Sequence, residues 1–307
     1  MKKLFLLLFS LCLVLSHNMI AQDKTDQGKK SKTKSSKEKK EDEENKVVRW
    51  NFGINIGGYA ANKFPAGFYS GSPQNINSFH YILSNYYWYQ EIYHNLKAID
   101  TVIVSGYPSN MHYSFTMMGG LFLRYNLDRK NGICLDANYC QLKATDAITL
   151  EVDPDPYSLK PADIRLCPVQ GKEYRVNVDL AYQRSFPLKS RINLFVQGGL
   201  MMNYTKVQKS IVVIADNEYN MINLYGSQYY VPNTNLQENS VIQGGFGYGF
   251  FAGGGIDLPV TDMFGFEPGA FVQYYNVNLE GYNKYKPSFG FYLRIMFGNI
   301  LSQAEPD

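Results

Sequence analysis

Hydrophobic and polar residues alternate with a period of two along much of this chain, and this period predicts β-strands. The stretch YSFTMMGGLFLRYNL, from Tyr113 to Leu127, has one apolar-aromatic face and one mixed polar face. The apolar-aromatic face holds Tyr113, Phe115, Met117, Gly119, Leu121, Leu123, Tyr125 and Leu127, and the other face holds Ser114, Thr116, Met118, Gly120, Phe122, Arg124 and Asn126. Such a strand is longer than the five or six residues usual in soluble domains. Its apolar face requires either a protein core or lipid against it.

The same alternation predicts eight strands. They cover residues 50–58, 113–127, 133–140, 174–183, 192–203, 245–257, 264–275 and 288–297. Their connections alternate between short segments at 128–132, 185–190 and 259–263 and longer segments at 61–110, 146–171, 206–240 and 280–287. Short turns at one end and long loops at the other, with an even strand number, are typical of outer-membrane barrels. We therefore expect an all-β fold, an eight-stranded antiparallel up-and-down transmembrane barrel in the cell outer membrane, with both chain ends in the periplasm.

Charged residues favour this barrel over a soluble β-sandwich. All six charged strand residues considered fall opposite the apolar face: Arg124, Asp136, Arg175, Asp179, Glu267 and Arg294. Barrel closure removes strand edges and turns this face into the lumen. Buried arginines need carboxylate partners, which Asp136, Asp179 and Glu267 supply. We predict that these six residues form a structural polar network in the lumen and that the apolar face, with aromatic residues near the strand ends, meets lipid.

The N-terminal segment predicts export. Lys2 and Lys3 precede an apolar run from Leu4 to Leu15, and more polar residues follow up to Ala21. This order is typical of a secretory signal peptide, and the run is too short to span a bilayer as a helix. We expect a signal peptide at residues 1–21, with Ser16 as an alternative cleavage position, and a disordered charged periplasmic linker at 22–47. The barrel then occupies residues 48–300.

Composition agrees with an exported barrel. The chain has 25 Tyr, 19 Phe and 26 Gly, and its mean hydropathy of −0.28 is compatible with strands of which only alternate residues meet lipid. A net charge of +3 is too small to indicate nucleic acid, which export also excludes. Cys134, Cys140 and Cys167 are expected as free thiols, the alternative being a bridge to Cys167 through a loop that folds back. No CxxC pair or metal-ligand spacing is present.

Candidate catalytic residues are few. His112 and Ser114 form an H-x-S pair that resembles the His and Ser of lipid A deacylase barrels, but no carboxylate lies near them in sequence to orient the His. Their predicted parity points into the barrel, so we interpret them as a polar rim. The aromatic segment from Asn77, which carries His80 and His94, predicts either a short helix packed over the barrel mouth or an exposed contact surface. We expect no catalytic residue, cofactor or metal site.

Three strand motifs carry a family resemblance. The segments GGLFLRYNL, GYGFFAGGGIDL and FGFYLRIMFG, with a signal ending in AQ, resemble the PorT-like small outer-membrane β-barrels over about Trp50 to Gly298. Some members of that family are implicated in type IX protein secretion. The resemblance implies a structural or accessory membrane component that contacts outer-membrane lipid and secretion-system or envelope proteins. The alternatives are a porin-like channel for small solutes and a lipid A-modifying enzyme.

The predicted strand number bears on the channel alternative. An eight-stranded barrel has an interior just wide enough for side chains. The inward glycines of strand 245–257 leave room for large side chains across the lumen, such as Arg124, Arg175, Phe271 and Tyr292. We therefore predict a filled lumen and no wide channel.

Overall fold

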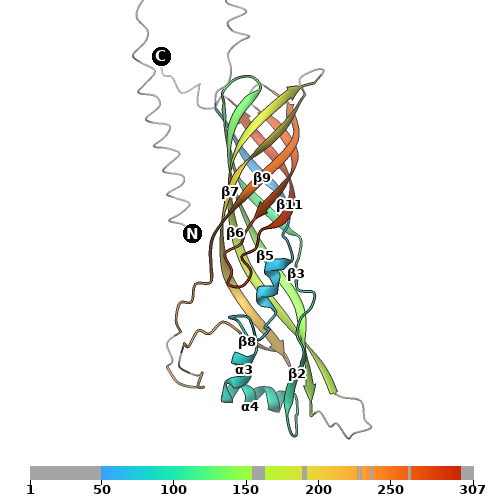
Figure 1. Ribbon diagram of the computed structural model, residues 1–307, viewed down its shortest axis with the longest axis vertical. Coiled ribbons are helices and arrows are strands. Elements are labelled where there is room, and N and C mark those ends of the chain that lie inside the picture. Colours follow the sequence, from blue (N-terminus) through green and yellow to red (C-terminus); the bar gives the residue numbers. More distant parts are fainter. Residues whose placement is uncertain are drawn as a thin grey trace, which may run out of the picture. The chain divides into compact units, whose positions relative to one another are not determined.

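The computed structural model describes residues 50–153, 163–188, 192–226, 228, 230–235, 238–261 and 264–298. The predicted signal peptide and linker lie outside these residues. The described residues form one antiparallel sheet of eleven strands, of which β2, β3 and β8 lie off a closed ring (Figure 1). The strands of the ring are β1 (Trp50–Ala60), β4 (Thr116–Asn126), β5 (Asn131–Val152), β6 (Asp163–Pro187), β7 (Asn193–Ile214), β9 (Gly244–Pro259), β10 (Phe264–Tyr275) and β11 (Lys286–Gly298). Consecutive ring strands pair with each other and β11 pairs with β1, which confirms the predicted all-β antiparallel barrel.

Three ring strands continue well past the others. Strands β5, β6 and β7 contain 22, 25 and 22 residues, so much of the segments predicted as long loops at 146–171 and 206–240 is strand. The prediction was wrong there because the apolar residues move from the outward face of the strand to its inward face. On β5, Leu142 and Ala144 are buried while Lys143 is exposed, the reverse of the pattern at Ile133 and Asp136. An apolar inward face with a polar outward face is the pattern of a water-soluble sheet.

The extended ends of β5, β6 and β7, together with the elements packed on them, form what we call the cap. The cap contains η2 (Phe64–Tyr69), α3 (His80–Ser84), α4 (Tyr86–Asn95), β2 (Val102–Gly106), β3 (His112–Tyr113) and β8 (Asn217–Asn220). Figure 1 shows β5, β6 and β7 running beyond the ring towards α3, α4 and β8. Strand β2 pairs with β5, and β8 pairs with β7. The cap lies at the end of the barrel opposite the short turns.

Apolar burial holds the cap together. Its core contains Phe68, Phe79, Ile82, Trp88, Ile92, Leu142, Ile148, Leu150, Val212 and Ile214. Each fully buried side chain of this size contributes about 1.5–3 kcal/mol. The side chain of Asn85 caps α4 by accepting hydrogen bonds from the amides of Tyr87 and Trp88. Part of the aromatic segment is therefore packed, while Tyr86 and Tyr87 on the same helix stay exposed. Among the described residues, no helix has the length and apolar character needed to cross a bilayer.

The outer wall of the ring is apolar and exposed. It presents Phe52, Ile54, Ile56, Leu121, Leu180, Leu194, Val196, Leu200, Phe246, Phe250, Phe289, Phe291 and Leu293, each at least about one-third accessible. Soluble monomers rarely expose so large a contiguous apolar area. On β4 the alternation predicted from sequence holds, since Met118 and Phe122 are buried and Met117 and Leu121 are exposed.

Candidate functional site: the filled lumen and the outer surface

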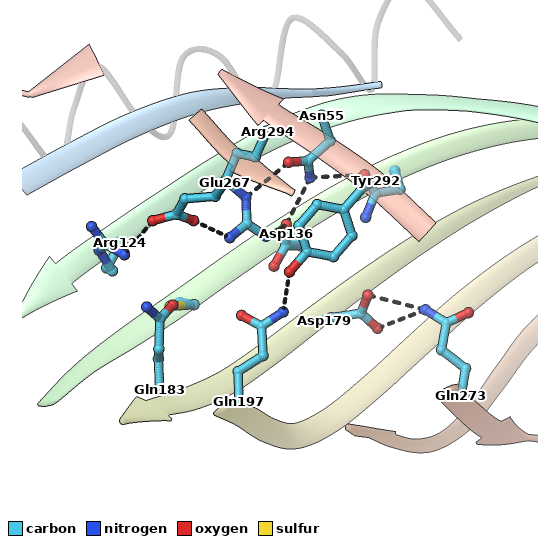
Figure 2. Close-up of polar contacts among 12 residues, drawn as sticks. Asn55, Arg124, Asp136, Asp179, Gln183, Gln197, Glu267, Gln273, Tyr292 and Arg294 are labelled. Atoms are coloured by element: carbon cyan, nitrogen blue, oxygen red, sulfur yellow. Dashed lines mark hydrogen bonds and ion pairs between the residues drawn. The ribbon is translucent and has the colours of Figure 1, made fainter. Parts of the chain in front are cut away.

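A buried ion network crosses the lumen near the short-turn end (Figure 2). Arg294 on β11 is 1% exposed and donates through Nη1 to Glu267 Oε2 at 2.8 Å, through Nη2 to Asp136 Oδ1 at 3.0 Å and through Nε to Asn55 Oδ1 at 2.9 Å. Arg124 Nη1 donates to Glu267 Oε1 at 2.7 Å. We call these five residues the Arg294 cluster. Four predicted lumen residues, Arg124, Asp136, Glu267 and Arg294, meet in it, so each buried charge has an opposite partner.

Aromatic rings seal the Arg294 cluster. The guanidinium carbon lies 3.4 Å from the ring centroid of Phe122 and 4.7 Å from that of Tyr292. The Tyr292 hydroxyl accepts from Gln197 Nε2 at 3.2 Å. The Tyr292 ring fits because Gly269 has no side chain, and a Cβ there would come within 2.6 Å of the ring. Glycine on the inner wall therefore makes room for rings, and the rings fill the lumen.

A small cavity opens below this cluster at the short-turn end. Its volume is about 100 Å³, and Arg124, Asp128, Lys130, Gln183 and Asp257 are among its lining residues. A polar cavity of this size has room for water. Of the Arg294 cluster, only Arg124 is among the residues that line it.

The middle of the lumen is held by amides. Asp179 is 1% exposed and accepts from Gln273 Nε2 at 3.1 and 3.3 Å, and Gln273 Oε1 accepts from Asn177 Nδ2 at 3.4 Å. Asp179 was expected to pair with an arginine, but the structure gives it an amide. Arg175 lies four residues away on the same strand, about 13 Å at the usual rise, and Arg294 is engaged by Asp136 and Glu267.

A second ion pair closes the lumen at the cap end. Arg175 Nε and Nη2 bind Glu173 Oε1 at 2.7 and 2.6 Å. Arg175 Nη1 donates to the Tyr275 hydroxyl at 2.6 Å. Glu173 Oε2 accepts from the Tyr69 hydroxyl at 2.5 Å and from the Tyr113 hydroxyl at 3.1 Å. Sequence reasoning placed Arg175 in the lumen but missed Glu173. Glu173 lies one residue before the predicted strand. Its position, two residues before Arg175 and therefore on the same inward face, could have identified it.

Tyr69 belongs to the segment after β1, which folds back into the barrel mouth. Its ring lies on Gly171, where a Cβ would come within 2.1 Å of the ring. The neighbouring Phe68 packs edge-on against Tyr69 and against Tyr282. Tyr69 is completely buried. The first long connection thus acts as an internal plug, with a buried hydroxyl that ties it to the barrel wall.

The predicted inward position of His112 and Ser114 is wrong. Both residues are exposed, whereas Tyr113, expected on the apolar outer face, is 8% exposed and points inward. The reason is a break in the strand, because β3 ends at Tyr113 and β4 begins only at Thr116. His112 Nδ1 lies 2.7 Å from the carbonyl of Asn110. The pair is therefore a feature of the outer surface.

Other candidate chemistry is sparse in the part of the chain that the structure describes. Cys134, Cys140 and Cys167 are buried and unbridged, and Cys134 Sγ donates to Gln183 Oε1 at 3.2 Å. No group of three or more His, Cys, Asp or Glu residues within the described ranges has a metal-binding arrangement.

Two aromatic belts border the apolar outer wall. At the cap end, ring centroids lie 6.1 Å apart for Tyr139 and Tyr174, 6.3 Å for Tyr174 and Tyr204, and 5.1 Å for Tyr204 and Phe246. We call these four residues the cap-side belt. At the short-turn end, ring contacts join Trp50 to Tyr125 and Phe264 to Phe297.

The spacing of the belts matches a membrane. Tyr182 lies opposite Ile133, and Ile133 lies opposite Tyr125 of the belt at the short-turn end. The stretch of β6 from Tyr174 to Tyr182 spans about 26 Å along the strand at 3.3 Å per residue. At the tilt of about 40° usual in such barrels, its height is about 20 Å, comparable to the apolar band of about 25 Å between aromatic girdles. Just past Tyr139, the exposed face of β5 also changes from apolar to polar. The outer surface is thus apolar between the belts and polar beyond the cap-side belt.

The chain therefore has the fold of a small outer-membrane β-barrel with a filled lumen. No family model matches the sequence, and no curated protein matches it. Solved structures with a similar fold include Neisserial surface protein A (8% identity, TM-score 0.36, covering 82% of this chain and 98% of that one) and OprG of Pseudomonas aeruginosa (10%, 0.35, 83% and 95%). Another is Ail, the attachment invasion locus protein of Yersinia pestis (10%, 0.28, 81% and 98%). With TM-scores below 0.5, these similarities add nothing about function, and the PorT-like resemblance stays a prediction.

Proposed function

We propose that this protein is a non-conducting outer-membrane barrel that anchors a folded cap at the cell surface, where the cap contacts partner proteins. The observation that carries the proposal is the blocked lumen. The Arg294 cluster closes it at one level, and the plug with Tyr69, Glu173 and Arg175 closes it at another. A transport pore would need a continuous polar passage instead.

Conductance tests this proposal. The purified barrel in planar bilayers should give little or no steady current, with a known porin as positive control for insertion. Protein insertion is checked in parallel by the heat-modifiable mobility of the same preparation. Large, stable current steps from the wild-type protein would reject the anchor and favour the small-solute channel.

Membrane location and orientation form part of the same proposal. The apolar wall between two belts supports insertion, and the short turns at one end support a periplasmic position for that end. A Thr234→Cys variant in the connection from β8 to β9 and a Lys130→Cys variant in the short turn after β4 test it, because both positions are exposed. A membrane-impermeant maleimide on intact cells should label Thr234→Cys only. Cys134, Cys140 and Cys167 are buried and should stay unlabelled. Labelling of Lys130→Cys alone would show that the orientation is the opposite of the one proposed.

The partner is proposed to be a component of protein secretion or of the envelope. The cap exposes Tyr86 at 68%, Tyr87 at 41% and Ile99 at 87%, and exposed aromatic residues are enriched where proteins bind. A photo-crosslinking residue at Tyr86 should capture such a component in intact cells, while the same residue at Lys130 should not. Loss of the protein should also leave secreted cargo in the periplasm. Normal secretion without the protein would reject the secretion role and leave the anchor.

A further inference from the structure

Three lysines occupy directly opposed positions on adjacent strands. Lys143 on β5 pairs with Lys172 on β6, and Lys172 pairs with Lys209 on β7. Lys143 and Lys172 are exposed and Lys209 is partly exposed, while their neighbours Leu142 and Ala144 are buried. The lysines therefore lie on the outer surface. Opposed side chains have Cβ atoms about 5 Å apart, and like charges there destabilise a sheet. An anion bound against the row would remove this repulsion.

The lysines lie directly beyond the cap-side belt. On β6, Lys172 is two residues from Tyr174 on the same face, about 7 Å at the strand rise. Lys206 on β7 lies opposite Tyr174 and adds a fourth ammonium group. Belt aromatics mark the boundary between the hydrocarbon and the headgroups. We call Lys143, Lys172, Lys206 and Lys209 the lysine row, and its height is that of lipid headgroups.

Among the residues that the structure describes, countercharge for the row comes from one carboxylate at one end. Lys209 Nζ binds Glu218 Oε2 at 2.7 Å, with the two side chains 40% and 56% exposed. Within the described residues, Lys143, Lys172 and Lys206 show no side-chain partner. Uncharged hydrogen-bonding groups lie beside them, because Gln141 Nε2 on β5 donates to Gln208 Oε1 on β7 at 2.6 Å. The surface therefore combines several free cations with amide groups.

We propose that the lysine row binds the phosphate groups of a phosphorylated glycolipid in the outer leaflet. The inference rests on the proposed membrane location and orientation. Lysine ammonium groups bind phosphate as point charges, and several of them around one lipid neutralise its charge. The amides of Gln141 and Gln208 face the sugar, and the acyl chains lie along the belt and the apolar residues Leu200 and Met202 on the same face. Charge, height and apolar contact thus point to a single lipid.

Lipid retention by the purified full chain tests the proposal. Native mass spectrometry is run with bis-phosphorylated lipid A, with dephosphorylated lipid A and with inorganic pyrophosphate as competitor. The test variant is Lys143→Gln/Lys172→Gln. The matched control is Lys130→Gln/Arg184→Gln, which removes two exposed charges at the opposite end of the barrel. Wild type and control should bind phosphorylated lipid A at least tenfold more tightly than the dephosphorylated form, and the test variant should lose this preference.

The other outcomes of the lipid-binding assay overturn the proposal. Equal retention of both lipids, an unchanged preference in the test variant, or an equal loss in the control would show that the row is not the site. Competition by pyrophosphate at the concentration of the lipid would indicate a general anion site. Without lipid the test variant should be at least as resistant to heat as wild type, because a like-charge contact is removed, and lower resistance would reject the repulsion. Cysteine labelling judges orientation separately, so lipid A binding with inverted labelling would reject only the orientation.

Discussion

The hydroxyl of Tyr69 donates to Glu173 Oε2 at 2.5 Å, across 104 residues of sequence. This bond joins the plug after β1 to the inner wall of β6. Glu173 also binds Arg175, so the plug is tied to a buried charge and not only packed against apolar groups. Closure of the lumen and anchoring of the cap therefore depend on the same contact.

Replacing Tyr69 by Phe should loosen the plug. The ring stays on Gly171, but the Glu173 carboxylate loses one donor, and a hydrogen bond to a charged group contributes about 1.5–3 kcal/mol. Urea-induced unfolding in lipid vesicles should show a loss in this range. Tyr86→Phe is the matched control, because that side chain is 68% exposed and its change should leave the unfolding midpoint in place. Equal effects of the two variants would contradict the anchoring role of Tyr69.

Glu267→Gln should destabilise the barrel without opening it. The variant removes the carboxylate that Arg124 binds and one of the two carboxylates of Arg294, and removal of one partner of a buried ion pair costs about 3–5 kcal/mol. Glu218→Gln breaks the exposed pair with Lys209 and should cost less than about 1 kcal/mol. Urea titrations compare the two variants, and planar bilayers check that neither conducts. A conducting Glu267→Gln barrel of normal stability would show that Glu267 acts as a gate.

Alternation along the strands predicted the barrel because each position faces either outward or into the lumen, and its residue type matches that environment. Leu121 and Arg124 differ by three positions on one strand, so opposite faces received lipid-compatible and charged side chains. The same rule failed where the environment changed. Past Tyr139 the alternation continues, but Leu142 lies inside and Lys143 outside. A search for strands with apolar residues outside therefore interprets this segment as a polar loop.

Contacts between distant segments were beyond the sequence pattern. Nothing in the local sequence of Tyr69 marks it as a partner of Glu173, because the plug folds back over a chain separation that periodicity does not constrain. The partner of Asp179 was likewise not predictable from the sequence. Its charge predicted an arginine partner, but the strand register places Gln273 within reach. A small break after β3 likewise reversed the predicted direction of Tyr113.

Acid should break the hydrogen bonds between the Asp153 carboxylate and the chain segment at residues 99–101. The Asp153 carboxylate accepts hydrogen bonds from the amides of Ile99, Asp100 and Thr101, and these bonds lower its pKa from the ordinary value. A lowered folded pKa means that the stabilisation is complete above the unfolded pKa of about 3.9 and disappears as the pH falls through the folded pKa. Amide NMR shifts of residues 99–101 should therefore titrate with a midpoint below 3.9. Asp153→Asn should abolish that titration, and a midpoint at or above 3.9 would contradict the contact.

The boundary between lipid and water on one strand gives a sharp test of the membrane interpretation. Leu200 and Gln208 both lie on the outer face of β7, but Leu200 lies between the belts and is 60% exposed, whereas Gln208 lies beyond Tyr204 of the cap-side belt. An arginine facing lipid at mid-depth costs about 2–4 kcal/mol in a barrel, and the cost falls to about 0–1 near the interface. Leu200→Arg should therefore reduce the folded, heat-modifiable band strongly.

Gln208→Arg is the matched control for that test, because strand, face and introduced charge are the same. It removes the exposed hydrogen bond from Gln141 and adds a positive charge beside Lys206 and Lys209. Each of these two changes at an exposed site should cost about 1 kcal/mol or less. Folding into vesicles at increasing urea concentration measures the difference between the variants. A soluble protein would tolerate arginine at both exposed positions about equally, because each side chain would meet water. Equal stability of the two variants would therefore reject lipid as the solvent of the outer wall, whatever the shape of the barrel.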